Sequence, residues 1–215
     1  MIASAILANS AVIFGYVSLF CLVTLHIISP EFKPNFRMVS EYALGKFKWV
    51  LTLFFISWGV SNISLALLLW GMVETAWTTI AVSLIFVSGI GAIMGGIFDV
   101  KHKLHGLSFG LGVPFLPIGA LIIVYYFKQN MDWQSNISIL LVSAHATWIS
   151  LILMGGTMFY FFSGLKSAGI AFGPDSPPMT ELPKGMTAIH GWANRLLVIC
   201  YIAFPMLVAK IVLSL

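Results

Sequence analysis

Charged residues are scarce in this chain of 215 residues, of which 8% are Asp, Glu, Lys or Arg. Typical soluble domains contain about a quarter. Hydrophobic residues make up 60% of the chain. So few charges exclude a water-soluble domain and leave no room for a folded catalytic module outside a membrane. The short polar segments also lack the basic face that nucleic-acid binding requires, so we expect no nucleic-acid partner.

Cysteine is equally rare. The only two, Cys21 and Cys200, both fall within apolar runs. A disulfide framework is therefore not expected.

Six uninterrupted apolar runs divide the chain. At a rise of about 1.5 Å per residue, each is long enough for a helix to cross a hydrocarbon core roughly 30 Å thick. The runs are apolar on every side, which excludes the alternating strands of a membrane barrel. We predict an all-α polytopic membrane protein in which residues 1–215 form one domain, a bundle of six transmembrane helices. The runs cover residues 9–29, 49–72, 77–98, 106–127, 137–162 and 191–214.

Lysine and arginine are distributed unequally between the two sides of this predicted bundle. Six crossings place both termini on one side, with residues 73–76 and 128–136, and loops 30–48, 99–105 and 163–190 on the other. Because Lys and Arg are retained in the cytoplasm during insertion, we predict a multi-pass protein of the cell (inner) membrane with both termini non-cytoplasmic. The basic residues of the predicted cytoplasmic side are Lys33, Arg37, Lys46, Lys48, Lys101, Lys103, Lys166 and Lys184.

Tryptophans mark the ends of several runs. Such residues commonly anchor helices at the level of the lipid headgroups, and we expect that role here. The tryptophans concerned are Trp49, Trp70, Trp77, Trp133 and Trp192.

The third and fourth runs contain features that affect helix packing. Gly91 and Gly95 have the small-xxx-small spacing that lets two helices approach closely, so oligomer formation is possible through this face. Pro114 and Pro117 each remove a backbone donor, which predicts that the fourth helix is kinked.

Two polar loops also have predictable features. In the first, we expect a short interfacial helix from Glu41 to Leu44, with Ser40 as its N-cap and Gly45 as its stop. The last loop should be an irregular cover over the bundle, because its prolines prevent helix formation. These are Pro174, Pro177, Pro178 and Pro183.

Several ionisable and polar residues fall near helix ends on the predicted cytoplasmic side. We expect some of them to converge in a polar pocket. Its candidate residues are Ser40, Glu41, Tyr42, Asp99, His105, His190 and Arg195.

Asp99 requires a cation, because a carboxylate at the end of a helix opposes the helix dipole. Lys103 or His102, one turn further on, and Arg195 are the candidate partners. Alternatively, Asp99, His105 and His190 are candidate ligands for a divalent metal, since zinc binds imidazole and carboxylate groups. The spacing contains no metal-binding motif, so the cofactor stays unassigned.

The polar residues also resemble a known family. The resemblance covers His26-x-x-Ser29-Pro30, the segment SEYALG at 40–45, Gly96-x-x-Asp99 and Leu104-His105-Gly106, and it ends with Gly191-x-x-Asn194-Arg195. Together they are similar to the domain-of-unknown-function 998 family of small prokaryotic membrane proteins. The resemblance implies six helices and no assigned biochemical activity. It places the family's recurrent polar positions at Ser40, Tyr42, Asp99, His105 and Arg195.

Three functions are compatible with these features. The first is a lipid-interacting bundle in which the polar pocket binds membrane lipids, with Arg195 and nearby lysines contacting an anionic headgroup. The second is a metal-dependent membrane hydrolase or acyl-transfer enzyme acting on lipid. The third is a small-solute transporter that uses an interrupted fourth helix.

Overall fold

The computed structural model describes residues 2–170 and 179–215. Every regular element in this part of the chain is a helix. The elements are α1 (Ile2–Ile28), η1 (Val39–Leu44), α2 (Lys48–Trp70), α3 (Ala76–Ile97), α4 (His105–Gly112), α5 (Phe115–Phe127), η2 (Met131–Asn136), α6 (Ile137–Ser167) and α7 (His190–Ser214).

Six helical spans are long and apolar enough to cross a membrane, which confirms the prediction from the apolar runs. One of these spans consists of α4 and α5 together. Most helix ends agree with the predicted runs within a few residues. However, α1 begins at Ile2 rather than near residue 9, and α6 continues to Ser167, past the predicted end at 162.

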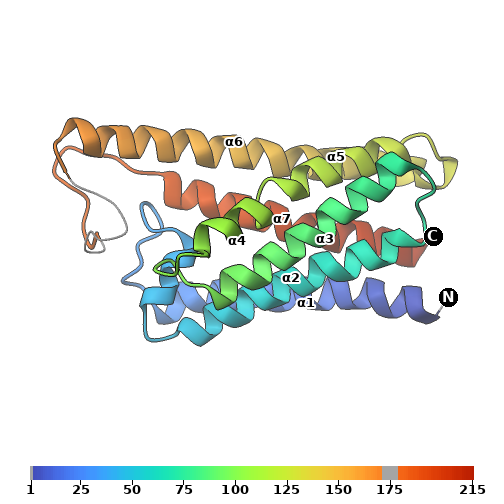
Figure 1. Ribbon diagram of the computed structural model, residues 1–215, viewed down its shortest axis with the longest axis horizontal. Coiled ribbons are helices and arrows are strands. Elements are labelled where there is room, and N and C mark those ends of the chain that lie inside the picture. The colour runs from blue at the N-terminus through green and yellow to red at the C-terminus, as the bar shows by residue number, and fades with distance from the viewer. Residues whose placement is uncertain (1, 171–178) are drawn as a thin grey trace.

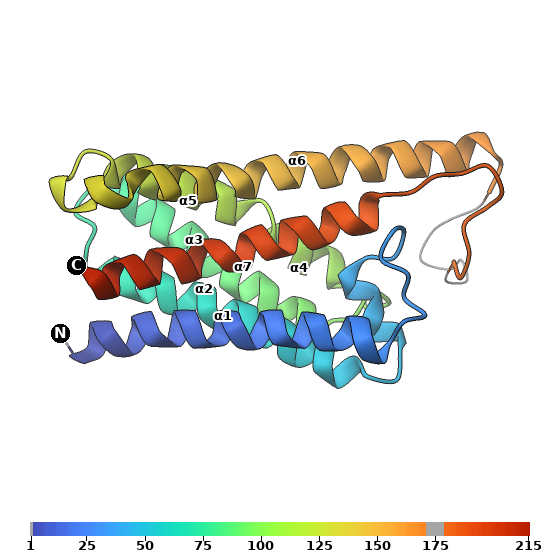
Figure 2. The ribbon, with the colours of Figure 1, turned by 180° about the vertical axis from the view of Figure 1, so that it is seen from behind.

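The spans follow one another around a closed ring. Each packs against the next in the chain, and α7 packs against both α6 and α1 (Figures 1 and 2). The two termini lie at the same end of the bundle, together with η2 (Figure 1). The opposite end, here called the loop end, carries the segments 29–47, which includes η1, and 98–104, together with residues 168–170 and 179–189.

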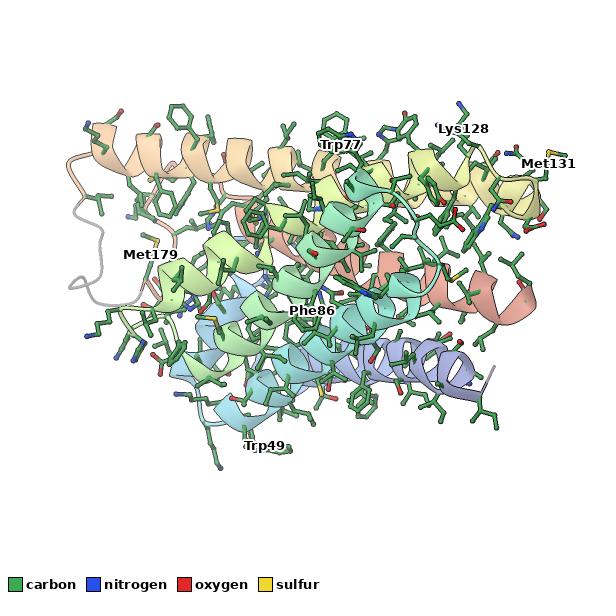
Figure 3. The ribbon with its side chains drawn as sticks, turned by 45° about the vertical axis from the view of Figure 1, so that its right-hand side comes forward. Trp49, Trp77, Phe86, Lys128, Met131 and Met179 are labelled. Atoms are coloured by element: carbon green, nitrogen blue, oxygen red, sulfur yellow. The ribbon has the colours of Figure 1, made fainter. Side chains whose placement is uncertain are left out.

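The outside of the ring is apolar, as expected of a surface that faces lipid. Figure 3 shows Trp49 and Trp77 on this outer surface, and both are exposed, as expected of headgroup anchors. Trp133 differs from its predicted role as an anchor, because it is only 3% exposed. It stacks on Phe127 with 3.8 Å between ring centroids and so belongs to the core.

The close approach of α3 and α4 depends on glycine. A Cβ atom at Gly91 would lie 2.2 Å from the backbone nitrogen of Gly112, so no side chain fits there. Gly95 faces Phe55 of α2 at an ordinary distance. Gly91 therefore serves a contact within the chain, and association of copies through the Gly91/Gly95 face stays a prediction.

The fourth span is interrupted at Val113 and Pro114, between α4 and α5. The carbonyl of Gly112 accepts a hydrogen bond from Ser88 Oγ at 2.7 Å, and that of Val113 accepts one from Tyr201 Oη at 2.8 Å. In a continuous helix, the Val113 carbonyl would accept from the backbone N–H four positions later. That residue is Pro117, which has no N–H, so the carbonyl needs another donor. Two buried hydroxyls thus donate hydrogen bonds to backbone carbonyls that would have no partner in lipid. The proline kink itself stays a prediction.

The first loop contains the expected short helix, which is a 3₁₀ helix beginning at Val39 rather than at Glu41. Its N-cap is Met38 and not the predicted Ser40. The Glu41 carboxylate, at the third position of this helix, accepts from the backbone N–H of the N-cap Met38 at 2.6 Å. Gly45 ends the helix, as predicted.

In the last loop, the segment around Pro174, Pro177 and Pro178 lies outside the described residues. The described part from residue 179 to 189 contains no helix.

Candidate functional site

Arg195 is the centre of a buried polar cluster at the loop end. It lies in the second turn of α7 and is only 3% exposed. Its Nε donates to His26 Nε2 at 2.7 Å, and its Nη2 donates to Tyr42 Oη at 3.3 Å. Its Nη1 donates to the carbonyl oxygens of Arg37 at 2.6 Å and Gly191 at 2.9 Å. One guanidinium therefore connects α1, η1 and α7.

All four acceptors of Arg195 are neutral groups of the protein itself. A planar guanidinium with five N–H donors suits this task, because it reaches several acceptors in fixed directions. The geometry explains how a buried cation is tolerated near the end of a membrane span. It also leaves little of the guanidinium free for an anionic lipid headgroup.

Arg37 and Glu41 extend this cluster toward the surface. Arg37 is buried, and its Nε lies 3.0 Å from Glu41 Oε1, while its Nη1 donates to the carbonyl of Met179. Burial raises the pKa of the Glu41 carboxyl, although the positive charge of Arg37 acts in the opposite direction. The pair fixes the first loop against the described part of the last loop.

Asp99 does not join the Arg195 cluster. Its carboxylate lies 2.6 Å from Lys48 Nζ and accepts from the Lys101 backbone N–H at 3.0 Å. The hydrogen bond from Lys48 lowers the pKa of Asp99. Lys48 is therefore the cation that pairs with Asp99 in place of the expected Lys103 or Arg195, and His102 adds only a weaker electrostatic effect on the pKa of Asp99. Because α3 ends at Ile97, Asp99 lies beyond the helix, and the spacing rule for helical pairs does not apply to it.

His190 is buried at the start of α7 beside the aromatic ring of Phe161, with 4.4 Å between ring centroids. Within residues 2–170 and 179–215, no three His, Cys, Asp or Glu side chains are grouped so that they could hold a metal ion. The structure therefore does not bring Asp99, His105 and His190 together as a metal site.

A second feature of the loop end is a cavity of about 300 Å³. Its walls come from η1, α2, α3, α4, α6 and α7, and most of them are apolar. Aromatic and methionine side chains provide much of this surface. Polar side chains also contribute to it: Ser40, His105, Ser108 and Asn194.

The cavity and the Arg195 cluster lie on opposite sides of η1. Ser40 lines the cavity, whereas Tyr42 contacts Arg195. The α7 residues that contact η1 are divided in the same way. Asn194 lines the cavity, and its Oδ1 accepts from the Val39 backbone N–H at 2.9 Å, whereas Arg195 lies in the cluster. Consecutive residues of α7 therefore hold η1 from two sides.

The predicted pocket is thus divided into separate parts. One part is the Arg195 cluster with Tyr42 and Glu41, and another is the cavity with Ser40 and His105. Asp99 pairs with Lys48, and His190 packs on the ring of Phe161.

The predicted pocket omitted several residues of these two sites, including Ser108 and Asn194 of the cavity wall. His26 and Arg37 belong to the Arg195 cluster, and Trp58 forms part of the cavity wall. Arg37 resembled an ordinary loop cation, and Trp58 resembled any aromatic residue of an apolar span. For His26, two signals were available: its place at the end of the first span, level with Arg195, and its place in the motif His26-x-x-Ser29-Pro30 of the family resemblance.

Comparisons with protein-family models, with curated proteins and with solved structures find no match to this chain. The similarity to the domain-of-unknown-function 998 family therefore stays a prediction based on the residues quoted above.

Proposed function

We propose that this integral membrane protein binds a membrane amphiphile, holding its apolar chain in the cavity between α4 and α6. The observation that carries this proposal is the cavity itself, whose walls are largely apolar and include Phe109 of α4 and Met154 and Met158 of α6. Apolar walls with a few polar groups are typical of sites for small organic ligands.

The cavity extends to the outer surface of the bundle. Gly106 and Phe109 line it and are also exposed on α4, Phe109 by 48%. An amphiphile can therefore enter sideways from the bilayer without crossing the loops. A volume of about 300 Å³ is at the lower end of ligand sites, which range from about 300 to 1,000 Å³. This size favours one hydrocarbon chain over a complete two-chain lipid.

Two glycines of α4 provide a matched test. A Cβ atom at Gly106 or at Gly110 meets nothing within 4 Å, but only Gly106 lines the cavity. Gly106→Leu should fill part of the cavity, whereas Gly110→Leu should add the same side chain outside it. Native mass spectrometry of both variants, purified from membranes, would measure the bound amphiphile. We expect the adduct to be lost in Gly106→Leu and kept in Gly110→Leu, and equal adducts in the two would contradict the proposal.

We further propose that the loop end faces the cytoplasm of a prokaryotic cell, with both termini outside, and that the chain is a member of the 998 family. The excess of Lys and Arg at the loop end supports this orientation. Single cysteines replacing Glu74 or Lys103, which are exposed at opposite ends, test it in a chain whose Cys21 and Cys200 are changed to Ala. A membrane-impermeant maleimide should label Glu74→Cys in intact cells and Lys103→Cys only after permeabilisation. The reverse pattern would overturn the orientation.

A further inference from the structure

We infer that the polar group of the bound amphiphile is uncharged and both donates and accepts hydrogen bonds, as a hydroxyl does, and that it binds beside His105 and Ser40. This inference rests on the proposed function and specifies the class of ligand. Among the described residues that line the cavity, none is Asp, Glu, Lys or Arg. A headgroup with a full charge would enter an apolar space without a counter-ion, which costs far more than burying a hydrogen-bonded hydroxyl.

His105 provides the acceptor for such a group. Its Nδ1 lies 2.9 Å from the carbonyl oxygen of Phe98. A carbonyl only accepts, so Nδ1 carries the hydrogen, and Nε2 of the neutral ring has a free lone pair. The bond to Phe98 also fixes the ring at the cavity wall. Nε2 can therefore accept a hydrogen bond from a ligand hydroxyl, whereas a carboxylate has no hydrogen to donate.

Ser40 and Trp58 provide the complementary donors. Ser40 lines the same cavity, and a serine hydroxyl can donate to a ligand oxygen. The Trp58 side chain is also part of the wall and is only 4% exposed, and its indole N–H has no hydrogen-bond partner among the described residues. A buried donor without a partner is costly, and an oxygen of the ligand would satisfy it.

Two cations of the loop end, Arg195 and Lys48, are already engaged by groups of the protein. Arg195 follows the cavity residue Asn194 in the sequence. Its guanidinium donates to four groups of the protein on the other side of η1. Lys48 is paired with Asp99. Both cations therefore have partners, and no Lys or Arg is among the described residues that line the cavity, so its wall offers no counter-ion for a phosphate or carboxylate.

Three probes of equal chain length separate the possibilities: decanol, decanoate and decylamine. Their dissociation constants would be measured by isothermal titration into the full chain in lipid nanodiscs. We expect decanol to bind at least about tenfold more tightly than either charged probe, because a charge inside this apolar cavity has no counter-ion.

His105→Asn identifies the group responsible. The shorter Asn amide can still donate to the Phe98 carbonyl but has no equivalent of Nε2. We expect this variant to lose about fivefold in decanol affinity, the approximate worth of one hydrogen bond, and to bind decanoate as before. Ser40→Ala should weaken decanol in the same direction, and thermal unfolding of both variants would verify their folding.

The outcomes distinguish this inference from the proposed function. If none of the three probes binds, or if Gly106→Leu leaves their binding unchanged, the proposed cavity site fails. If Gly106→Leu blocks binding but decanoate or decylamine binds at least as tightly as decanol, the cavity site stands and the uncharged ligand class is wrong. Unchanged decanol affinity in both His105→Asn and Ser40→Ala would also overturn the inference.

Discussion

The Nε–H of Arg195 donates a hydrogen bond to Nε2 of His26, joining the last helix of the bundle to the first over a sequence separation of 169 residues. The bond depends on the tautomer of His26, whose Nδ1 lies 2.7 Å from the Leu22 carbonyl and therefore carries the hydrogen. A local contact within α1 thus prepares the acceptor that closes the helical ring at its loop end.

The first prediction concerns this closure. Replacing Arg195 with Met keeps an unbranched side chain but leaves His26, Tyr42 and two backbone carbonyls without their donor. Because an unsatisfied buried acceptor costs about 1–3 kcal/mol, we expect the free energy of unfolding to fall by about 3 kcal/mol or more. Thermal unfolding in detergent would measure the loss.

Arg195→Lys tests whether the shape of the guanidinium matters in addition to its charge. An ammonium is a compact charge that cannot reach all four acceptors, so this variant should also be clearly destabilised. Lys166→Met, an exposed substitution near the end of α6, is the control and should unfold like the wild type. If Arg195→Lys were as stable as the wild type, the several N–H donors of the guanidinium would not be what joins α7 to α1 and η1.

The second prediction concerns the contact between α3 and α4. Gly91→Ala would place a Cβ against the backbone of Gly112, which cannot rotate away as a side chain can. We expect a loss of about 1–3 kcal/mol from overpacking. Gly155→Ala in α6 is the matched control, because a Cβ there meets nothing within 4 Å. Equal thermal stability of the two variants would contradict the close approach.

The six spans could be predicted from the sequence because each depends on a local property, a run of apolar residues long enough to cross a bilayer. The first loop was also largely predictable, since Gly45 ends its short helix as expected. Trp133 was not predictable in this way. An aromatic residue between two spans has the same local pattern whether it faces lipid or stacks on Phe127, and only packing in three dimensions decides between them.

The candidate site was less predictable because its contacts join distant segments. Asp99 was correctly expected to need a cation, but Lys48 is 51 residues away in the sequence and becomes its neighbour only when α2 packs on α3. Ser40 and Tyr42 are separated by one residue and nevertheless belong to different sites. The sequence shows which residues are polar but does not show on which side of η1 each lies.

The third prediction concerns the carbonyl groups at the interruption of the fourth span. Tyr201→Phe removes the donor to the Val113 carbonyl and should lower the free energy of unfolding by about 1 kcal/mol, since interhelical hydrogen bonds in membranes are individually modest. Adding Ser88→Ala removes the donor to Gly112 as well and should lower it further. Tyr160→Phe, at a residue 67% exposed, serves as control. Thermal melts of Tyr201→Phe that match those of Tyr160→Phe would rule out a stabilising role for this bond.

The fourth prediction concerns Glu41 and pH. Burial raises the pKa of this carboxyl above its ordinary value near 4.5, so folding favours the protonated form. The stability that Glu41 contributes is therefore fully present below about pH 4.5 and is lost as pH rises through the raised pKa.

The Glu41→Gln variant tests this, because it keeps the shape of the side chain but does not titrate. The melting temperature of the wild type minus that of Glu41→Gln should consequently fall as pH rises above about 4.5 and through the raised pKa. Glu74→Gln, an exposed carboxylate at the other end of the bundle, is the matched control. A difference that instead grows with pH would mean that the ion pair with Arg37 outweighs the burial of the carboxylate.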